Sequence, residues 1–297
     1  MTEQPPRGFP EAEHRARLAL AQAAMAAEGL DALLLTTEPE IRWITGFLTR
    51  FWESPTRPWF LVVPARGEPT AAIPSIGGEL MRATWIDDVR TWSSPDYADD
   101  GVSLLAATLA ERTPPDARIG VPMGRESLLR MPLADWHALA ERIGRRRFCD
   151  DRGLMRALRM VKSEAEIEKI AAACAVAGRA FARAPEILTP GRPLSEVFRR
   201  FQILCLEEGA DQVPYLAGGA APGGYGDVIS PASDRALERG DVAMLDAGLS
   251  RDGYFADFDR NWSLGPPPAE VAEAHARLVE AAGVAAELAR PGATPAD

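Results

Sequence analysis

The sequence predicts an α/β domain followed by the first part of an α+β domain. Apolar strand patterns alternate with amphipathic helix patterns from residue 10 to residue 150, and this order is typical of layered α/β folds. Two long helix patterns follow, and then two strand patterns that meet at Asp252-Gly253. A chain of 297 residues is long enough for two hydrophobic cores.

The composition is that of an acidic globular protein. Hydrophobic residues make up 46% and charged residues 26% of the chain, with a net charge of -10. Such a surface disfavours nucleic-acid binding, which depends on Lys and Arg contacts to phosphate. The one basic run, Arg142 to Arg147, is predicted to be a solvated helix end. No apolar run is long enough to cross a bilayer and no signal peptide is recognisable, so we expect a cytoplasmic protein without membrane partners.

In the first domain, residues 10–150, the predicted elements follow one another with short turns. A helix over 11–29 ends at Gly29, and "RGE" turns one strand back on the next. The remaining elements are predicted at "DALLLTT", "WFLVVPA", "TAAIP", "GGELMRATW", "DVRTW", "DGVSLLAATLAERT", "RIGVPM" and "MPLADWHALAERIG". Helices interleaved with apolar strands in this way indicate an α/β layer domain.

Residues 151–162 are predicted to link this domain to a second one, residues 163–297. Ser163 is followed three residues later by Glu166, just ahead of an apolar run, and this spacing is a capping-box signature for a helix start. Further helices are predicted from about residue 195 to 209 and from about 269 to 289.

A short internal repeat follows two of the predicted helices. The segments "EILTPGRPLSE" (186–196) and "ELARPGATPAD" (287–297) both read as a helix end, a Pro-Gly turn and a new helix start. The repeat suggests a duplicated unit whose second copy has barely begun at Asp297.

Four aspartates lie between the last two predicted helices, at Asp246, Asp252, Asp257 and Asp259. Asp246 follows an apolar run, where a buried strand is predicted to end or bend. In the next strand, alternation places Asp257 and Asp259 on one face. Asp252-Gly253 is a strong hairpin signal because both turn positions tolerate positive φ. The hairpin is therefore predicted to bring Asp246 and Asp257 onto neighbouring strands.

Two convergent carboxylates in an apolar setting raise at least one pKa unless a cation joins them. A divalent ion with oxygen ligands is one solution, and an ordinary decorated hairpin is the alternative that spacing alone leaves open. Asp252 is expected to be a turn residue only. Asp259 is expected to pair with a nearby arginine.

The segment "KSEAEIEKI", followed by "GDVAMLDAGLSRDGYFADFDRNWSLG", resembles the creatinase/aminopeptidase P/prolidase family of pita-bread metallohydrolases, peptidase family M24. The family signature, a Gly-Asp pair, an apolar strand, Asp, ten residues, Asp and a nearby Arg, is occupied by Gly240, Asp241, Asp246, Asp257 and Arg260. The resemblance implies a creatinase-type N-terminal α/β domain over residues 10–150. It implies the first part of a pita-bread catalytic domain over 163–297.

The resemblance also implies a site for two divalent ions, of manganese, cobalt, zinc or iron. Asp246 and Asp257 would be the first two metal ligands, and a metal-activated hydroxide would attack a C–N bond whose carbonyl the metals polarise. Hydrolysis of an amide or peptide bond is therefore expected, with Xaa-Pro peptides ranked first. No residue is assigned as a catalytic acid or base.

The sequence departs from the family pattern in two places. The family completes its site with a His and two Glu well beyond the second Asp, whereas here the last His is His275 and no Glu follows Glu287. We therefore expect an incomplete catalytic domain that is inactive by itself. Ile229 occupies the place of a substrate-side His. Two alternatives stay open: a member that acts on a small molecule, such as a dimethylsulfoniopropionate lyase or ectoine hydrolase, and a non-catalytic binding or dimerisation module.

Tyr215, Tyr225 and Trp52 are the predicted contacts to a small-molecule or short-peptide substrate, and core packing is the equal alternative for the two tyrosines. The Gly-rich segment 216–228 lacks the Lys-Ser/Thr of a phosphate loop, so a pocket wall is predicted there, with a flexible loop as the alternative. Trp52 lies in the aromatic and arginine-rich segment 47–60. Family members use this region at a dimer interface, so the resemblance implies a homodimer, with core packing of Trp52 as the alternative.

Overall fold

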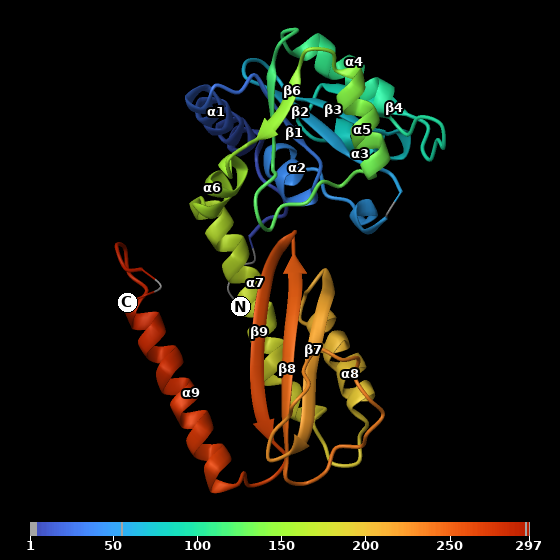
Figure 1. The fold of residues 1–297 in the computed structure, drawn as a ribbon. Helices are drawn as coiled ribbons and strands as arrows, with labels where there is room; N and C mark the ends of the chain where they lie inside the picture. Colours follow the sequence, from blue (N-terminus) through green and yellow to red (C-terminus); the bar gives the residue numbers. More distant parts are fainter. Residues whose placement is uncertain (1–4, 55, 295, 297) are drawn as a thin grey trace. The chain divides into compact units, whose positions relative to one another are not determined.

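The computed structural model describes residues 5–54, 56–294 and 296. The chain divides into two compact units, one spanning Pro6–Ala165 and one that contains Glu166–Asp297. We call them the N-terminal and the C-terminal unit (Figure 1). In the described ranges, no helix combines the length and the apolar character that crossing a membrane requires.

The N-terminal unit is built on a six-stranded sheet with the order β4-β3-β2-β1-β5-β6. The central strand β1 pairs antiparallel with β2 and parallel with β5. The strands are β1 (Ala32–Leu35), β2 (Phe60–Pro64), β3 (Thr70–Pro74), β4 (Asp88–Trp92), β5 (Arg118–Val121) and β6 (Arg147–Asp150). The predicted strand pair turned by "RGE" is confirmed as β2 and β3, which are antiparallel.

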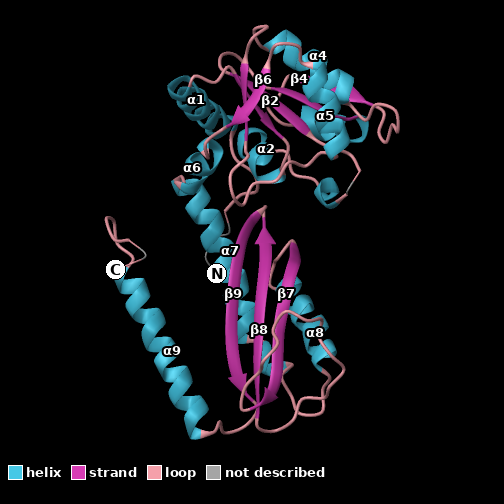
Figure 2. Cartoon of the chain, in the orientation of Figure 1, coloured by secondary structure: helices cyan, strands magenta, loops and turns pink. Residues whose placement is uncertain are grey.

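Helices cover both faces of this sheet (Figure 2). Alternate residues of β1 enter different hydrophobic clusters, Leu33 with residues of α1 and α2, and Leu34 with residues of α4 and α5. The helices are α1 (Glu11–Glu28), α2 (Glu38–Thr45), α3 (Gly78–Arg82), α4 (Val102–Arg112), α5 (Leu133–Arg142) and α6 (Leu154–Met160), with short 3-10 turns η1 (Arg50–Glu53) and η2 (Ser75–Gly77). Helices therefore cover both apolar faces of the sheet. This is the α/β layering that the alternating sequence pattern predicted.

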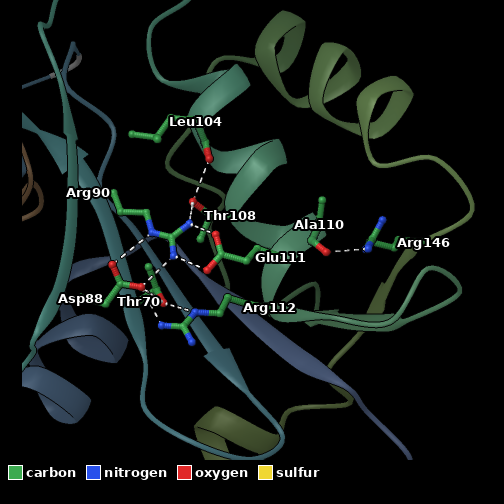
Figure 3. Close-up of polar contacts among 9 residues, drawn as sticks. All are labelled: Thr70, Asp88, Arg90, Leu104, Thr108, Ala110, Glu111, Arg112 and Arg146. Carbon is green, nitrogen blue, oxygen red and sulfur yellow. Dashed lines mark hydrogen bonds and ion pairs between the residues drawn. The ribbon is translucent and has the colours of Figure 1, made fainter.

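A polar network ties the edge strand β4 to β3 and α4 (Figure 3). The Arg90 guanidinium donates to both Asp88, at 2.9 and 3.1 Å, and Glu111, at 2.8 and 2.9 Å. Arg112 donates to Asp88 at 2.6 Å and to Thr70 at 2.8 Å. Burial would raise the pKa of Asp88, but hydrogen bonds from Arg90, Thr70 and Arg112 outweigh it and lower that pKa. The edge of the sheet is therefore held by charge-assisted hydrogen bonds.

The basic run is not only a solvated helix end, as the sequence had predicted. Helix α5 ends at Arg142, and Arg147 begins strand β6, which pairs with β5. Between them, Arg146 donates to the Ala110 carbonyl at 2.9 Å and to the Thr113 hydroxyl at 2.8 Å. The prediction missed β6 because it is short and half exposed, and its pairing with β5 cannot be read from local periodicity.

The C-terminal unit has a three-stranded antiparallel sheet with the order β7-β8-β9. Helices α7 and α8 pack on one face of it, against Ala243, Leu245, Ala247 and Leu249 of β8 (Figure 2). The elements are α7 (Glu164–Ala182), η3 (Ala184–Glu186), α8 (Leu194–Glu207), β7 (Gln212–Pro222), β8 (Asp241–Arg251), β9 (Tyr254–Ser263) and α9 (Ala269–Leu288). Helix α7 begins directly after Ser163, where the capping signature placed it.

Strand β7 occupies the first part of the Gly-rich segment, for which the sequence predicted a pocket wall with a flexible loop as the alternative. Residues up to Pro222 are a strand rather than a loop, and only the residues after it form a connection to β8. Gly218 has a φ of 150°, and a Cβ there would lie 2.1 Å from the Met244 carbonyl oxygen. The lack of a side chain at Gly218 therefore allows β7 to pair closely with β8. Strand propensity alone would have predicted that a glycine weakens or interrupts the strand.

The two segments of the internal repeat follow long helices, as predicted. Pro-Gly turns come after α7 and α9, and Gly191 and Gly292 both have positive φ, 87° and 91°. The two helices differ in their packing. Helix α7 contributes five apolar residues to the hydrophobic core, whereas α9 has no buried residue.

Candidate functional site

The register of β8 and β9 places three aspartates on one face of the sheet. Asp246 lies opposite Asp259, and Gly248 lies opposite Asp257. Residues that are opposite in an antiparallel pair share a face, and so do residues two apart in one strand. Asp246, Asp257 and Asp259 therefore lie together on the face that α7 and α8 leave free. We call it the carboxylate face.

The hairpin prediction is confirmed. Asp252 and Gly253 form the turn with φ of 51° and 72°, as a two-residue turn with positive φ at both positions requires. Asp246 is not at a strand end, however. It lies in the middle of β8, which continues to Arg251, because pairing with both β7 and β9 extends the strand.

Asp252 is more than a turn residue, which corrects the prediction. Its carboxylate accepts a hydrogen bond from the Lys169 ammonium of α7, and both side chains are buried. Its backbone N–H donates to the Asp211 carboxylate at 2.6 Å. In the same region, the Tyr254 hydroxyl donates to the buried Glu166 at 2.9 Å. The hairpin tip is thus fastened to α7 by buried polar contacts that the sequence did not reveal.

Asp246 and Asp257 converge. Burial raises the pKa of Asp257, and the charge of Asp246 and a hydrogen bond between the two carboxyl groups raise it further. Neighbouring carboxylates disfavour each other's charged form, which is why each raises the pKa of the other. The Tyr215 hydroxyl of β7 donates to Asp246 Oδ2 at 2.7 Å, and this hydrogen bond is the main reason why the pKa of Tyr215 is raised.

Asp259 does not pair with an arginine in the described part of the chain, contrary to the prediction. Arg260 follows it in β9 and therefore points to the opposite face, where its guanidinium lies 5.1 Å from the Phe258 ring centroid. Arg260 donates to the backbone carbonyl of Asp259, at 2.6 Å, and not to its carboxylate within the described part of the chain. The alternation of the strand separates the two side chains although they are adjacent in sequence.

Tyr225 lies at the same face. Its hydroxyl donates to Asn261 Oδ1 at 2.6 Å, and Asn261 follows Asp259 by two residues in β9. Burial is the main cause of the raised pKa of Tyr225, and the charge of Asp259 adds to it. The structure thus brings Tyr215 onto the predicted ligand Asp246, whereas Tyr225 lies further along the same face, beside Asn261 and Asp259.

Trp52 belongs to the N-terminal unit and is 9% exposed. Its ring packs against Phe47 and Trp59, with centroids 6.0 and 5.8 Å away. Arg130 holds the surrounding loop by donating to the carbonyls of Trp52 and Arg57 at 3.1 and 2.8 Å. This environment matches the core-packing alternative for Trp52, while the neighbouring Phe51 is 40% exposed.

Asp241 of the Gly-Asp pair has a structural role. Its buried carboxylate accepts two hydrogen bonds from Arg235, at 2.7 and 2.9 Å, and one from the Glu238 N–H at 2.8 Å. The hydrogen bond from Arg235 is the main cause of its lowered pKa. Asp241 therefore holds the connection that enters β8. Sequence reasoning could assign Asp241 only to a family motif, because Arg235 carries no pattern of its own.

Asp246 and Asp257 fit as two oxygen ligands of a divalent cation. They converge on one open face, and a cation would remove the repulsion that raises the pKa of Asp257. Among the described residues, no group of three or more His, Cys, Asp or Glu side chains is arranged to hold a metal ion. His14 is buried, with Nδ1 3.2 Å from the Trp43 carbonyl, and His275 is exposed on α9.

Comparison with known proteins adds a further line of evidence. Residues 168–297 match the family model described as "Metallopeptidase family M24". Residues 17–161 match the family model described as "Creatinase/Prolidase N-terminal domain". A probable dipeptidase PepE of Mycobacterium tuberculosis is 30% identical over 300 residues, which is 97% of this chain and 74% of that protein. An ectoine hydrolase of Halomonas elongata is 24% identical over 97% of this chain and 75% of its own length.

Solved structures are similar over most of this chain. Dipeptidase PepE from Mycobacterium ulcerans has a TM-score of 0.72 and 31% sequence identity, over 90% of this chain and 68% of that one. A prolidase from Thermococcus sibiricus has a TM-score of 0.77 at 22% identity, over 90% of this chain and 70% of that one. These matches confirm the predicted fold class, a creatinase-type α/β domain followed by a pita-bread domain. The chain therefore belongs to the M24 metallopeptidase family of creatinase- and prolidase-related proteins.

Proposed function

We propose that the chain contributes to metal-dependent hydrolysis of a C–N bond in a short peptide, at the carboxylate face. The observation that carries the proposal is the convergence of Asp246 and Asp257 on an open sheet face, at the positions where the M24 signature has its first two ligands. The dipeptidase relatives support a dipeptide as the substrate class.

In this proposal Asp246 and Asp257 hold one side of a site for divalent cations. The bound metal supplies Lewis acidity for the scissile carbonyl and lowers the pKa of a water molecule. Tyr215 orients the Asp246 carboxylate through its hydrogen bond. Tyr215 and Tyr225 present their phenol groups beside the carboxylates and contact the substrate.

Metal binding is the direct test of the ligand assignment. Titration of the chain with Mn²⁺, followed by calorimetry or by the EPR signal of free Mn²⁺, should show binding that Asp246→Asn and Asp257→Asn each weaken at least about tenfold. Asp259→Asn is the matched control, since it removes the same charge from the same face and should keep most of the affinity. If all three variants lose the same Mn²⁺ affinity, the loss reflects only the negative charge of the face, and the assignment of Asp246 and Asp257 as ligands is contradicted.

Turnover separates the substrate classes. With Mn²⁺ present, Xaa-Pro dipeptides, dipeptides without proline, and ectoine should be compared under the same conditions. Metal-dependent cleavage of dipeptides that the two ligand variants lose would support the proposal, and it would contradict the expectation from the sequence that the chain is inactive by itself. Ectoine is included because Ile229 stands where peptidase members have a His, and because one relative is an ectoine hydrolase. Metal binding with no turnover of any of them would agree with the expectation that the chain is inactive by itself.

A further inference from the structure

Buried polar side chains join helix α7 to the tip of the β8–β9 hairpin. The Lys169 ammonium of α7 donates to the Asp252 carboxylate of the turn, and the Tyr254 hydroxyl of β9 donates to Glu166 Oε1 of α7 at 2.9 Å. Glu166, Lys169 and Asp252 are 4%, 3% and 9% exposed. Because Glu166 and Lys169 are three residues apart in a helix, they lie on the same face of it. We call this group, Glu166, Lys169, Asp252 and Tyr254, the tip clasp.

Buried charges of this kind are better suited to fix an arrangement than to add stability. The desolvation of two ions offsets most of the attraction between them, so a buried ion pair contributes little net stability. Any arrangement that separates the two ions leaves a charge buried without compensation, which is strongly unfavourable. The pair of Lys169 and Asp252 therefore disfavours every position of the hairpin tip on α7 except the one observed.

The position of Asp257 depends on the course of the β9 backbone. Strand β8 lies between β7 and β9, and its Asp246 accepts a hydrogen bond from Tyr215 of β7. Strand β9 pairs only with β8 among the described residues. The residue opposite Asp257 is Gly248, which has no side chain to hold the carboxylate. The direction of β9 therefore decides where the Asp257 carboxylate lies.

Helix α7 runs along β9 and holds it on both sides of Asp257 (Figure 1). Tyr254, three residues before Asp257, is bound to Glu166. Phe258, which directly follows Asp257, packs against Phe181 of α7 with ring centroids 6.2 Å apart. One helix therefore fixes the part of the strand that carries the candidate ligand.

We propose that Lys169 and Glu166 are positioning residues for Asp257. Through the tip clasp they hold the hairpin so that β9 brings the Asp257 carboxylate to Asp246, close enough for both to bind one divalent cation. The inference rests on the proposed function, because it takes Asp257 as a metal ligand. The two residues act through the backbone of β9 and not on the cation itself.

Two variants open the tip clasp. Lys169→Met/Asp252→Asn removes both charges of the buried pair, and Asn tolerates the φ of 51° at the turn position. Tyr254→Phe removes only the hydroxyl of the second contact. The matched control is Arg179→Met/Glu208→Gln, which removes an ion pair of 2.9 Å that α7 makes outside the tip clasp.

Mn²⁺ titration of the folded variants is the measurement. A contact with a purely structural role would change the free energy of unfolding and leave the Mn²⁺ affinity of the folded protein unchanged. Both variants of the tip clasp should bind Mn²⁺ about fivefold more weakly, a smaller loss than for a group that contacts a ligand directly. The control should keep the original affinity, and far-UV circular dichroism shows whether each variant is folded.

The two candidate ligands distinguish positioning from a general loss of affinity. In an Asp257→Asn background no carboxylate is left at this position, so opening the tip clasp should cost no further affinity. In an Asp246→Asn background the loss of about fivefold should persist, because Asp257 still binds. Equal losses in both backgrounds would overturn the inference, and so would an unchanged affinity when both ligands are present.

The outcomes also separate this inference from the proposed function. If Asp257→Asn alone binds Mn²⁺ normally, both fail, because Asp257 is then not a ligand. If Asp257→Asn weakens binding while the variants of the tip clasp do not, only the positioning role fails. If the double variant does not fold, Tyr254→Phe decides by itself, since it removes one oxygen atom and no charge.

Discussion

Tyr215 and Asp246 are joined by one hydrogen bond of 2.7 Å across the β7–β8 pair. Tyr215 lies opposite Gly248, and Asp246 precedes Gly248 by two residues, so the phenol reaches the carboxylate diagonally. Because the hydroxyl occupies Oδ2, it fixes the carboxylate and leaves Oδ1 for another partner. Hydrogen bonds of this kind orient metal ligands and tune their affinity.

Removal of the Tyr215 hydroxyl should therefore weaken metal binding. Tyr215→Phe is expected to lower Mn²⁺ affinity about tenfold or more, with little effect on folding because the side chain is 42% exposed. Tyr225→Phe removes a hydroxyl of the same face that contacts Asn261 instead, and it should leave the affinity unchanged. Mn²⁺ titration of both variants tests this prediction. An unchanged affinity in Tyr215→Phe would show that the hydrogen bond does not orient the Asp246 carboxylate for metal binding.

The lowered pKa of Asp241 predicts how the stability of the protein depends on pH. Its folded-state pKa is lowered below the usual 3.8, so its stabilising contribution is present above pH 3.8 and is lost as the pH falls through the folded-state pKa. Asp241→Asn should lower the free energy of unfolding by about 2 kcal/mol at neutral pH, because a buried carboxylate loses charge-assisted hydrogen bonds. Urea unfolding should show this gap between the two proteins shrinking in acid. A gap that is the same at neutral and acid pH would contradict the role of the charge.

At the scale of elements, the hairpin β8–β9 carries both residues of the candidate metal site, Asp246 and Asp257. Its tip is fastened to α7 by the buried Lys169–Asp252 pair, and its strands are held by β7 on one side. Removal of one partner from a buried ion pair strongly destabilises the fold, because the other charge stays buried without compensation. The position of Asp246 and Asp257 therefore depends on long-range contacts as well as on the turn.

The close approach of β7 to β8 can be tested at one glycine. Gly218→Ala would place a Cβ 2.1 Å from the Met244 carbonyl oxygen, at a φ that L-residues rarely adopt. We expect a loss of about 2 kcal/mol or more in the free energy of unfolding, together with weaker Mn²⁺ binding because the Tyr215–Asp246 contact crosses this pair. Gly226→Ala, where no atom lies within 4 Å of the added Cβ, is the control and should be nearly neutral. Equal stability of the two variants would mean that the sheet adapts without cost.

At the scale of the molecule, the two units have separate cores. The hydrophobic cluster of the C-terminal unit contains residues from Ala173 onward, and the other two clusters are confined to residues 18–155. A ligand that binds one folded unit stabilises that unit by mass action. The homodimer and the cytoplasmic location stay predictions.

Metal should therefore stabilise one unit selectively. Free Mn²⁺ at about 100 times its dissociation constant should raise the stability of the C-terminal unit by about 2.7 kcal/mol. Of the seven tryptophans, only Trp262 follows residue 165, so tryptophan emission reports mainly on the N-terminal unit and far-UV circular dichroism reports on both. The emission transition should stay in place while part of the dichroism transition moves up. A shift of the emission transition by the same amount would show that the two units unfold together.

The sequence by itself determined the features that depend on local pattern. Alternation fixed which aspartates share a face, Asp252-Gly253 fixed the hairpin turn, and the spacing of Asp246 and Asp257 identified the family. These features need only the neighbours along the chain, because strand period and turn conformation are local properties.

Only the tertiary structure decided which distant groups meet. It turned a Gly-rich segment into strand β7, joined Asp252 to Lys169, brought Tyr215 onto Asp246, and left Asp259 without an arginine among the described residues. None of these contacts follows from periodicity, because pairing between segments depends on the shape and burial of both partners. The physical reason is that side-chain direction is set locally, whereas the partner that a side chain finds is set by packing of the whole unit.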